Sequence, residues 1–245
     1  MGEIGILIDL DWAPDAAIDD TAGLLREAGV HATWFVTHRS PAVDRLAEEH
    51  ELFELGVHPN FLRGSTHGEN AADVLEHCMR LVPQAIAVRT HGLVQSTALV
   101  TQMVAVTPLR IDASVLLPRV TSVPPAVLPT AAGPMVRVTC CWEDDVEMLA
   151  ERPVWRLDDL AIDGLALFCF HPIHVWRNHA SLSGYEAMKR APGGISEASA
   201  SDPLPGLGSR SMFLDLLTRL RGEGSATLTR HISRYPEAAA IVRAS

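Results

Sequence analysis

Short apolar runs alternate with amphipathic helical patterns over the first part of the chain, and this alternation limits the possible folds more than any other feature. The apolar runs have the length of buried strands, whereas the segments between them repeat apolar residues every three or four positions, as surface helices do. Strands that alternate with helices favour a parallel sheet with helical crossovers over an all-α or all-β fold. We therefore expect strands at 4–10, 31–37, 52–58 and 85–91, and helices at 15–30, 40–50 and 71–82.

The pattern is less regular beyond about residue 95, where a Pro-rich link at 118–134 interrupts it. The segment 179–209 is rich in Ser, Gly and Pro and is expected to form a long loop, of a length that is usually functional or mobile. A chain of 245 residues is long enough for one large core, so we expect a single domain over 1–245. The remaining expected elements are strands at 109–117, 134–142, 164–171 and 225–233 and a helix at 209–224.

The charge and the cysteines exclude several classes of protein. A net charge of -10 and a pI near 5.5 provide no basic surface for a phosphate backbone, so we expect no nucleic-acid partner. Apolar runs stay well short of the roughly 20 residues that span a bilayer, and the N-terminus lacks a signal-peptide pattern, so we expect a cytoplasmic protein without a membrane partner. The 4 cysteines follow neither a disulfide framework nor a zinc-binding spacing, and we expect buried free thiols. The pattern makes no prediction of oligomeric state.

Unusual polar residues follow several of the expected strands. The carboxyl ends of parallel strands open on one face of an α/β fold, so these side chains are expected to meet there. Taken singly, each Asp could be a helix cap and each His a residue of the rim. Taken together, Asp and His suit a divalent metal, and imidazole favours zinc, iron or cobalt over magnesium. The residues are Asp9, Asp11, His58, Arg89, His91, His171 and His174.

Asp9 and Asp11 are separated by a single leucine. Residues two apart in a strand point to the same face, so both carboxylates could reach the mouth of the fold while Leu10 packs outward. Trp12 follows them, and its ring could either line the site as an aromatic wall for a sugar or fill the interior.

These motifs resemble the polysaccharide deacetylases of the NodB-homology type, related to carbohydrate esterase family 4, and within them the WbmS-type branch. The resemblance extends from the first strand to about Trp176 and rests on the order of its motifs, because each one alone is short. It implies a single catalytic domain with a distorted (β/α) barrel of fewer than eight strands. The motifs are "IDLDWA", "HATWFV", "ELGVHPN", "VRTHGL" and "FHPIH", with "WEDDVEM" as a weaker match.

The resemblance also implies roles for individual residues. Asp9 would be the general base and Asp11 a metal ligand, in an Asp-x-Asp variant of the adjacent pair that is more usual in the family. His58 would be the second ligand. Arg89 would orient the catalytic aspartate, and His171 would be the general acid.

The third metal ligand is the point at which this chain departs from the family. The family usually has a histidine four residues after the second ligand, where this sequence has Leu62. We expect His67 in "RGSTHG" to replace it, with His91, His174 or water as the alternatives. His91, His174 and Trp12 are otherwise expected to contact the substrate.

The implied activity is that of a metal-dependent deacetylase, which hydrolyses a linear amide and removes an N-acetyl group from an aminosugar or a small metabolite that contains one. The metal would be zinc, with cobalt, iron or nickel as alternatives, and would lower the pKa of a bound water whose proton Asp9 accepts. His171 would protonate the departing nitrogen. The alternatives are hydrolysis of another amide, such as a ureide or formamide, or of an ester, and a non-catalytic ligand-binding relative whose metal site is incomplete because of Leu62.

Overall fold

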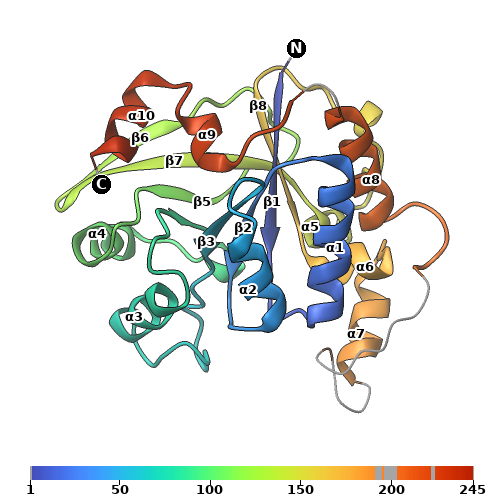
Figure 1. Cartoon of the computed structure of the whole chain (residues 1–245), viewed down its shortest axis with the longest axis horizontal. Helices are drawn as coiled ribbons and strands as arrows, with labels where there is room; N and C mark the ends of the chain where they lie inside the picture. The colour runs from blue at the N-terminus through green and yellow to red at the C-terminus, as the bar shows by residue number, and fades with distance from the viewer. Residues whose placement is uncertain (1, 191–194, 196–202, 222–223, 245) are drawn as a thin grey trace.

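The computed structural model of the chain describes residues 2–190, 195, 203–221 and 224–244 (Figure 1). Within these residues, one 8-stranded sheet has the order β5-β4-β3-β2-β1-β8-β7-β6. A further pairing of β5 with β7 closes the parallel strands into a barrel, and β6 adds to β7 in the antiparallel sense outside it. The strands are β1 Glu3–Asp9, β2 Ala32–Val36, β3 Phe53–Val57, β4 Ala87–Val88, β5 Ile111–Leu116, β6 Ala126–Thr130, β7 Gly133–Glu143 and β8 Leu165–Phe170.

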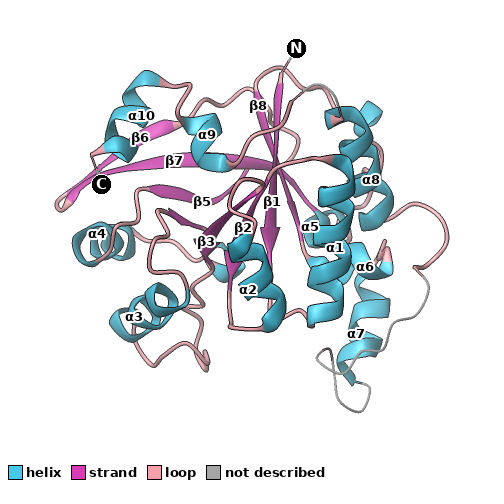
Figure 2. Ribbon diagram, in the orientation of Figure 1, coloured by secondary structure: helices cyan, strands magenta, loops and turns pink. Residues whose placement is uncertain are grey.

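Helices surround the barrel (Figure 2). Their ends carry the signals seen in the sequence: the Ser40 side chain accepts a hydrogen bond from the Val43 N–H at the start of α2, and Gly29 ends α1 in a left-handed conformation. The helices are α1 Asp15–Ala28, α2 Pro41–Glu48, α3 Ala71–Leu81, α4 Thr97–Val106, α5 Asp144–Glu147, α6 Pro172–Arg177, α7 Leu182–Arg190, α8 Ser209–Leu220, α9 Leu228–Ile232 and α10 Pro236–Arg243, with 3₁₀ turns η1 His91–Leu93 and η2 Leu157–Asp159.

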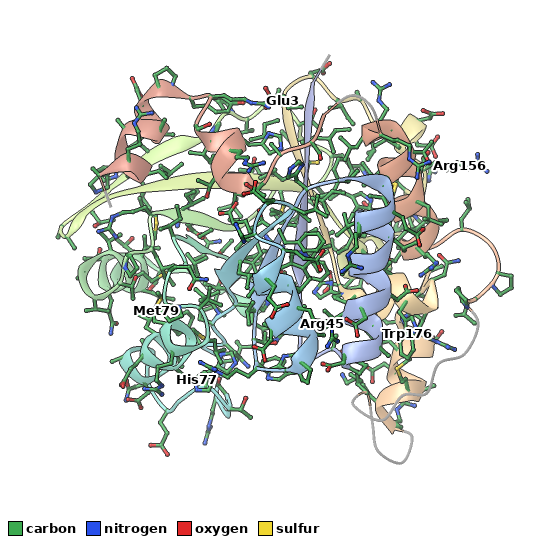
Figure 3. The ribbon with its side chains drawn as sticks, in the orientation of Figure 1. Glu3, Arg45, His77, Met79, Arg156 and Trp176 are labelled. Atoms are coloured by element: carbon green, nitrogen blue, oxygen red, sulfur yellow. The ribbon has the colours of Figure 1, made fainter. Side chains whose placement is uncertain are left out.

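The core has two layers, and alternate residues of each strand belong to different layers. Ile8 and Trp34 pack in the outer layer, whereas Leu7, Phe35 and Ile111 belong to a second cluster that joins strands across the barrel. Buried residues of α9 and α10 belong to this inner cluster as well, so these helices close the barrel at the end where β1 begins. Figure 3 shows side chains filling the space between strands and helices, with Glu3 labelled at that closed end. The parallel strands finish at the opposite end of the barrel, which α9 and α10 do not cover, and a functional site is expected at that end.

The expected α/β barrel is confirmed, and so are the strands expected between residues 4 and 171. The strand expected at 225–233 is wrong, because this segment contains helix α9. Leu228 and Ile232 are four residues apart and therefore share one face of a helix, and both are buried in the inner cluster.

Several other elements were absent from the sequence-based expectation, among them β6, α4 and α7. β6 lies inside the Pro-rich link at 118–134, where it pairs with β7 at the end of the sheet order. Helix α4 is apolar over most of its surface, so its helical period is weak in the sequence. The expected excursion at 179–209 contains α7, while 191–194 and 196–202 lie outside the described residues.

All 4 cysteines are free and buried, as expected. Among the helices that the structure describes, none has the length and apolar character needed to cross a membrane.

Candidate active site

The first site residues follow β1 through a turn of unusual backbone conformation. β1 ends at Asp9, and the buried side chain of Leu10 packs in the outer core layer. Asp11 and Trp12 then have positive φ angles of 42° and 54°, and the Trp12 N–H donates a 3.1 Å hydrogen bond to the Thr37 hydroxyl. Asp9 and Asp11 therefore both reach the open end of the barrel with Leu10 packed outward, as expected. The expected cause is wrong, however, since a left-handed turn and not strand alternation positions Asp11.

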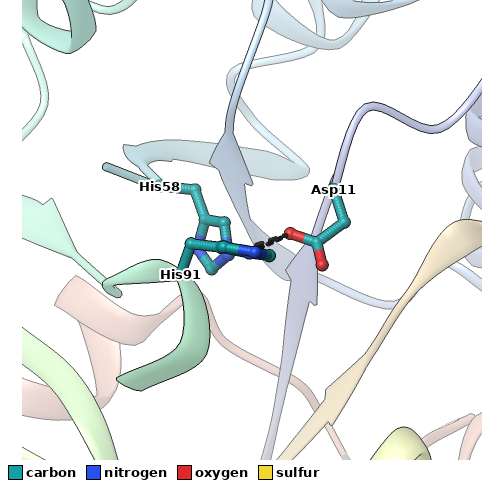
Figure 4. Close-up of side chains that lie close together, drawn as sticks. All are labelled: Asp11, His58 and His91. Carbon is teal, nitrogen blue, oxygen red and sulfur yellow. Dashed lines mark hydrogen bonds and ion pairs between the residues drawn. The ribbon is translucent and has the colours of Figure 1, made fainter. Parts of the chain in front are cut away.

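Asp11 meets two histidines from neighbouring strand ends (Figure 4). Its Oδ1 atom lies 3.1 Å from Nε2 of His58, which follows β3, and 3.0 Å from Nδ1 of His91, which opens η1 after β4. The three potential ligand atoms all lie within 4.8 Å of one another. One carboxylate and two imidazoles form a ligand set that suits a divalent transition metal.

The electrostatics of this cluster favour an ionised carboxylate. Burial opposes ionisation, but hydrogen bonds from His58 and His91 hold the pKa of Asp11 well below its usual value. The hydrogen bond to Asp11 in turn raises the pKa of His91. The negative charge of Asp11, which stabilises the imidazolium form of His91, would also attract a cation, so a metal could replace that proton in the cluster.

The structure does not bring His67 into this cluster. Its Nδ1 accepts a 3.2 Å hydrogen bond from the Asn60 N–H, and its Nε2 lies 2.9 Å from the Thr37 carbonyl oxygen. Both ring nitrogens are therefore used by the protein, and burial lowers the pKa of His67 to about 4. The ring packs 5.3 Å from that of Trp12, which also lies 5.4 Å from the ring of His91. The geometry thus favours His91 over the expected His67 as third ligand and makes His67 a support for Trp12.

Arg89 joins Asp9 to a carboxylate that sequence reasoning did not select. Its Nε donates to Oδ2 of Asp9 at 2.8 Å, its Nη2 to Oε2 of Glu143 at 2.6 Å, and its Nη1 to the Ala113 carbonyl at 2.5 Å. The other oxygen of Asp9, Oδ1, is buried, has no hydrogen-bond partner within the described part of the chain, and lies 3.6 Å from Nδ1 of His58. Arg89 therefore holds one oxygen of Asp9 and leaves the other facing the site, while burial raises the pKa of Glu143 to about 7.

His171, which follows β8, is held by a second carboxylate that sequence reasoning missed. Asp144 Oδ1 lies 2.7 Å from His171 Nδ1, and Asp144 Oδ2 accepts the His171 backbone N–H at 3.0 Å and the Ser209 hydroxyl at 2.8 Å. Burial opposes a charged ring, but Asp144 holds the pKa of His171 well above its usual value. The other ring nitrogen, Nε2, lies 3.6 Å from Oδ2 of Asp11 and so faces the ligand cluster. The acidic run of "WEDD" directly after an expected strand is the signal that could have revealed both Glu143 and Asp144.

His174 lies behind His171, outside the ligand cluster. Its Nδ1 is 2.9 Å from Nδ1 of His179, and its ring packs 5.5 Å from that of His171. Burial lowers the pKa of His174 to about 3, so the ring is neutral. On its other side, Tyr185 of α7 packs edge-on against it with ring centroids 4.9 Å apart. His174 is thus placed to support the acid histidine, and α7 brings part of the 179–209 excursion to the site.

Comparison with known proteins identifies the family. The family model described as WbmS-like polysaccharide deacetylase matches residues 6–189. The chain belongs to this deacetylase family. The crystal structure of a putative polysaccharide deacetylase involved in O-antigen biosynthesis, WbmS from Bordetella bronchiseptica, is 36% identical to this deacetylase family member, with a TM-score of 0.75 over 89% of this chain and 90% of WbmS. The WbmS-type resemblance read from the sequence is therefore confirmed.

A more distant structural match is the peptidoglycan deacetylase PdaC from Bacillus subtilis, at 13% identity and a TM-score of 0.49 over 99% of this chain and 96% of PdaC. A search of curated proteins found no match. Deacetylases of the WbmS-like kind are generally metal-dependent, and the residues of this member fit a metal by their own chemistry. Asp11 lies within 3.1 Å of His58 and 3.0 Å of His91, so the three side chains converge.

Proposed function

We propose that this protein is a metal-dependent hydrolase that removes the N-acetyl group from an aminosugar or from a small metabolite containing one. Membership of the deacetylase family supports the reaction class, and the O-antigen role given to WbmS supports a carbohydrate substrate. The observation that carries the proposal is the arrangement of three groups at one barrel end. The Asp11 cluster has the Arg89-bound carboxylate of Asp9 beside it and the Asp144-bound ring of His171 across from it.

The metal would be held by Asp11, His58 and His91, with zinc as the first candidate and cobalt, iron or nickel as alternatives. When bound, it would supply an activated water and polarise the acetyl carbonyl. His91 follows a different strand from His58, so this chain replaces the family's usual second histidine, absent at Leu62, from a separate loop.

The residues on either side of the cluster divide the proton transfers. Asp9 accepts the proton of the attacking water at Oδ1, because Arg89 occupies Oδ2. His171 donates a proton from Nε2 to the departing nitrogen, because Asp144 occupies Nδ1. A base must begin the reaction without its proton and an acid with it. The raised pKa of His171 favours the protonated ring that the acid needs. Trp12 flanks His91 and offers an aromatic face to a sugar ring.

The test combines metal analysis with acetate release. Purified protein is assayed with N-acetylglucosamine, N-acetylgalactosamine, their UDP conjugates and chitotetraose, before and after removal of metal and its replacement by zinc or cobalt. We expect acetate and free amine in equal amounts, loss of activity on chelation, and its recovery with metal. Turnover of a ureide or formamide, with no acetate released from any of these sugars, would favour the alternative that the protein hydrolyses a non-sugar amide.

Variants test the assigned roles within the same assay. Asp11→Ala and His91→Gln are expected to lose metal, whereas Asp9→Asn is expected to retain metal and lose about 10²- to 10⁴-fold in rate, the usual contribution of a general base. The matched control is His77→Gln, because His77 lies outside the ligand set. Retention of metal by His91→Gln would contradict the proposed ligand set. Absence of metal from the wild-type protein, with no turnover after addition of zinc, cobalt or iron, would favour the non-catalytic relative.

A further inference from the structure

Asp145, in α5, carries a buried oxygen that the protein does not use. Three acidic residues follow one another here, and two of them are paired: Glu143 with Arg89, and Asp144 with His171 and Ser209. Oδ1 of Asp145 is buried, and among the described residues it has no hydrogen-bond partner. A buried carboxylate oxygen without a partner costs about 1–3 kcal/mol or more, and the residue as a whole is only partly buried, so this carboxylate is suited to accept a hydrogen bond from a bound ligand.

Asp145 lies close to the acid histidine. One of its oxygens lies within 4.8 Å of a ring nitrogen of His171 and of an oxygen of Glu143. Glu143 and His171 already have charged protein partners, so this trio is poorly suited to hold a metal of its own. Asp145 therefore lies on the acid's side of the site, close to the ring of His171.

We propose that Asp145 is a substrate-binding residue, whose carboxylate accepts a hydrogen bond from the nitrogen that His171 protonates. The inference rests on the proposed deacetylation. In the substrate this nitrogen carries one N–H. When the C–N bond breaks, its electron pair stays on nitrogen and the proton of His171 Nε2 joins it, while the oxygen of water leaves in acetate. The product is an amine, which takes up a further proton from the solvent to become an ammonium ion, so the hydrogen bond to Asp145 gains charge as the product forms.

Comparing the activity on an amide substrate with that on an ester substrate distinguishes this role from a structural one. 4-Nitrophenyl acetate has no N–H, and its phenolate leaves without a proton. We expect Asp145→Ala to lower kcat/KM about 10- to 100-fold for the N-acetyl sugar that the wild type hydrolyses, and to change it less than about twofold for the ester. Asp159→Ala, at an exposed carboxylate of η2, is the control and should change neither. Equal losses on both substrates, or a loss of bound metal in Asp145→Ala, would overturn the proposal.

A binding measurement keeps this inference separate from the proposed function. Glucosamine and glucose are titrated into the wild-type and Asp145→Ala proteins at a pH where the amine is protonated. The expected result is a loss of about tenfold or more in affinity for glucosamine, with glucose unaffected. If the wild type releases no acetate from any N-acetylhexosamine, the deacetylase proposal fails, and the binding measurement still decides the role of Asp145. Equal affinity of the two proteins for glucosamine would refute that role.

Discussion

Replacing Asp144 by Asn tests whether its charge sets the protonation of His171. Asp144 is fully buried and contacts His171 twice, through the 2.7 Å approach to Nδ1 and the 3.0 Å bond from the backbone N–H. Asparagine keeps the size and one acceptor but loses the charge. The backbone of His171 can therefore stay in place while its charged ring loses its main support.

The size of the effect follows from the interaction that is removed. A hydrogen bond to a charged group contributes about 1.5–3 kcal/mol, and about 1.4 kcal/mol corresponds to one pKa unit, so the pKa of His171 should fall by about 1–2 units. A general acid must be protonated to act, and a lower pKa removes the proton at lower pH. The alkaline limb of the pH profile of kcat/KM should thus move down by about 1–2 pH units, with a rate loss of about 10- to 100-fold above it.

The assay is acetate release from pH 5 to 10 for the wild type, Asp144→Asn and Ser209→Ala. Ser209→Ala is the matched control, because it removes one hydrogen bond to Asp144 without changing any charge, and its alkaline limb should stay in place. If Asp144→Asn lowers the rate equally at every pH and leaves the limb where it was, Asp144 acts by position alone and the electrostatic reasoning is refuted.

Three other predictions concern the folded protein. Arg89→Met should lower the free energy of unfolding in urea by about 3–5 kcal/mol, because it leaves two buried carboxylates without their cation; a loss below about 1 kcal/mol would show that they are solvated or protonated at little cost. Burial lowers the folded-state pKa of His174 to about 3, so the unfolded chain binds more protons between pH 6.5 and 3 and stability falls as the pH falls. His174→Asn should reduce that slope by about 1.4 kcal/mol per pH unit, whereas an unchanged slope would mean that His174 is protonated when folded. The buried thiols should react with Ellman's reagent only after denaturation, and fast reaction of the native protein would contradict their burial.

The sequence was most informative about features that local pattern controls. Alternating apolar runs and helical segments predicted the α/β barrel, and polar residues at strand ends predicted where the site lies, because the ends of parallel strands meet on one face. It was least informative where two patterns overlap. Leu228 and Ile232 fit either a strand or a helix, and only their packing at the closed end of the barrel decides for the helix.

Within the site, the sequence by itself identified Asp9, Asp11, His58, Arg89 and His171 as a group. For the third ligand it favoured His67, with His91 among the alternatives. Only the tertiary structure decided the rest, because the deciding contacts join residues far apart in the chain. β5 pairs with β7 to close the barrel, and in the closed barrel Arg89 contacts Glu143, 54 residues away. A left-handed turn, which strand periodicity does not predict, carries Asp11 to a histidine 80 residues away, at 91. The alternation of the strands therefore determined which residues come to the mouth of the barrel, and the closed barrel determined which of them touch.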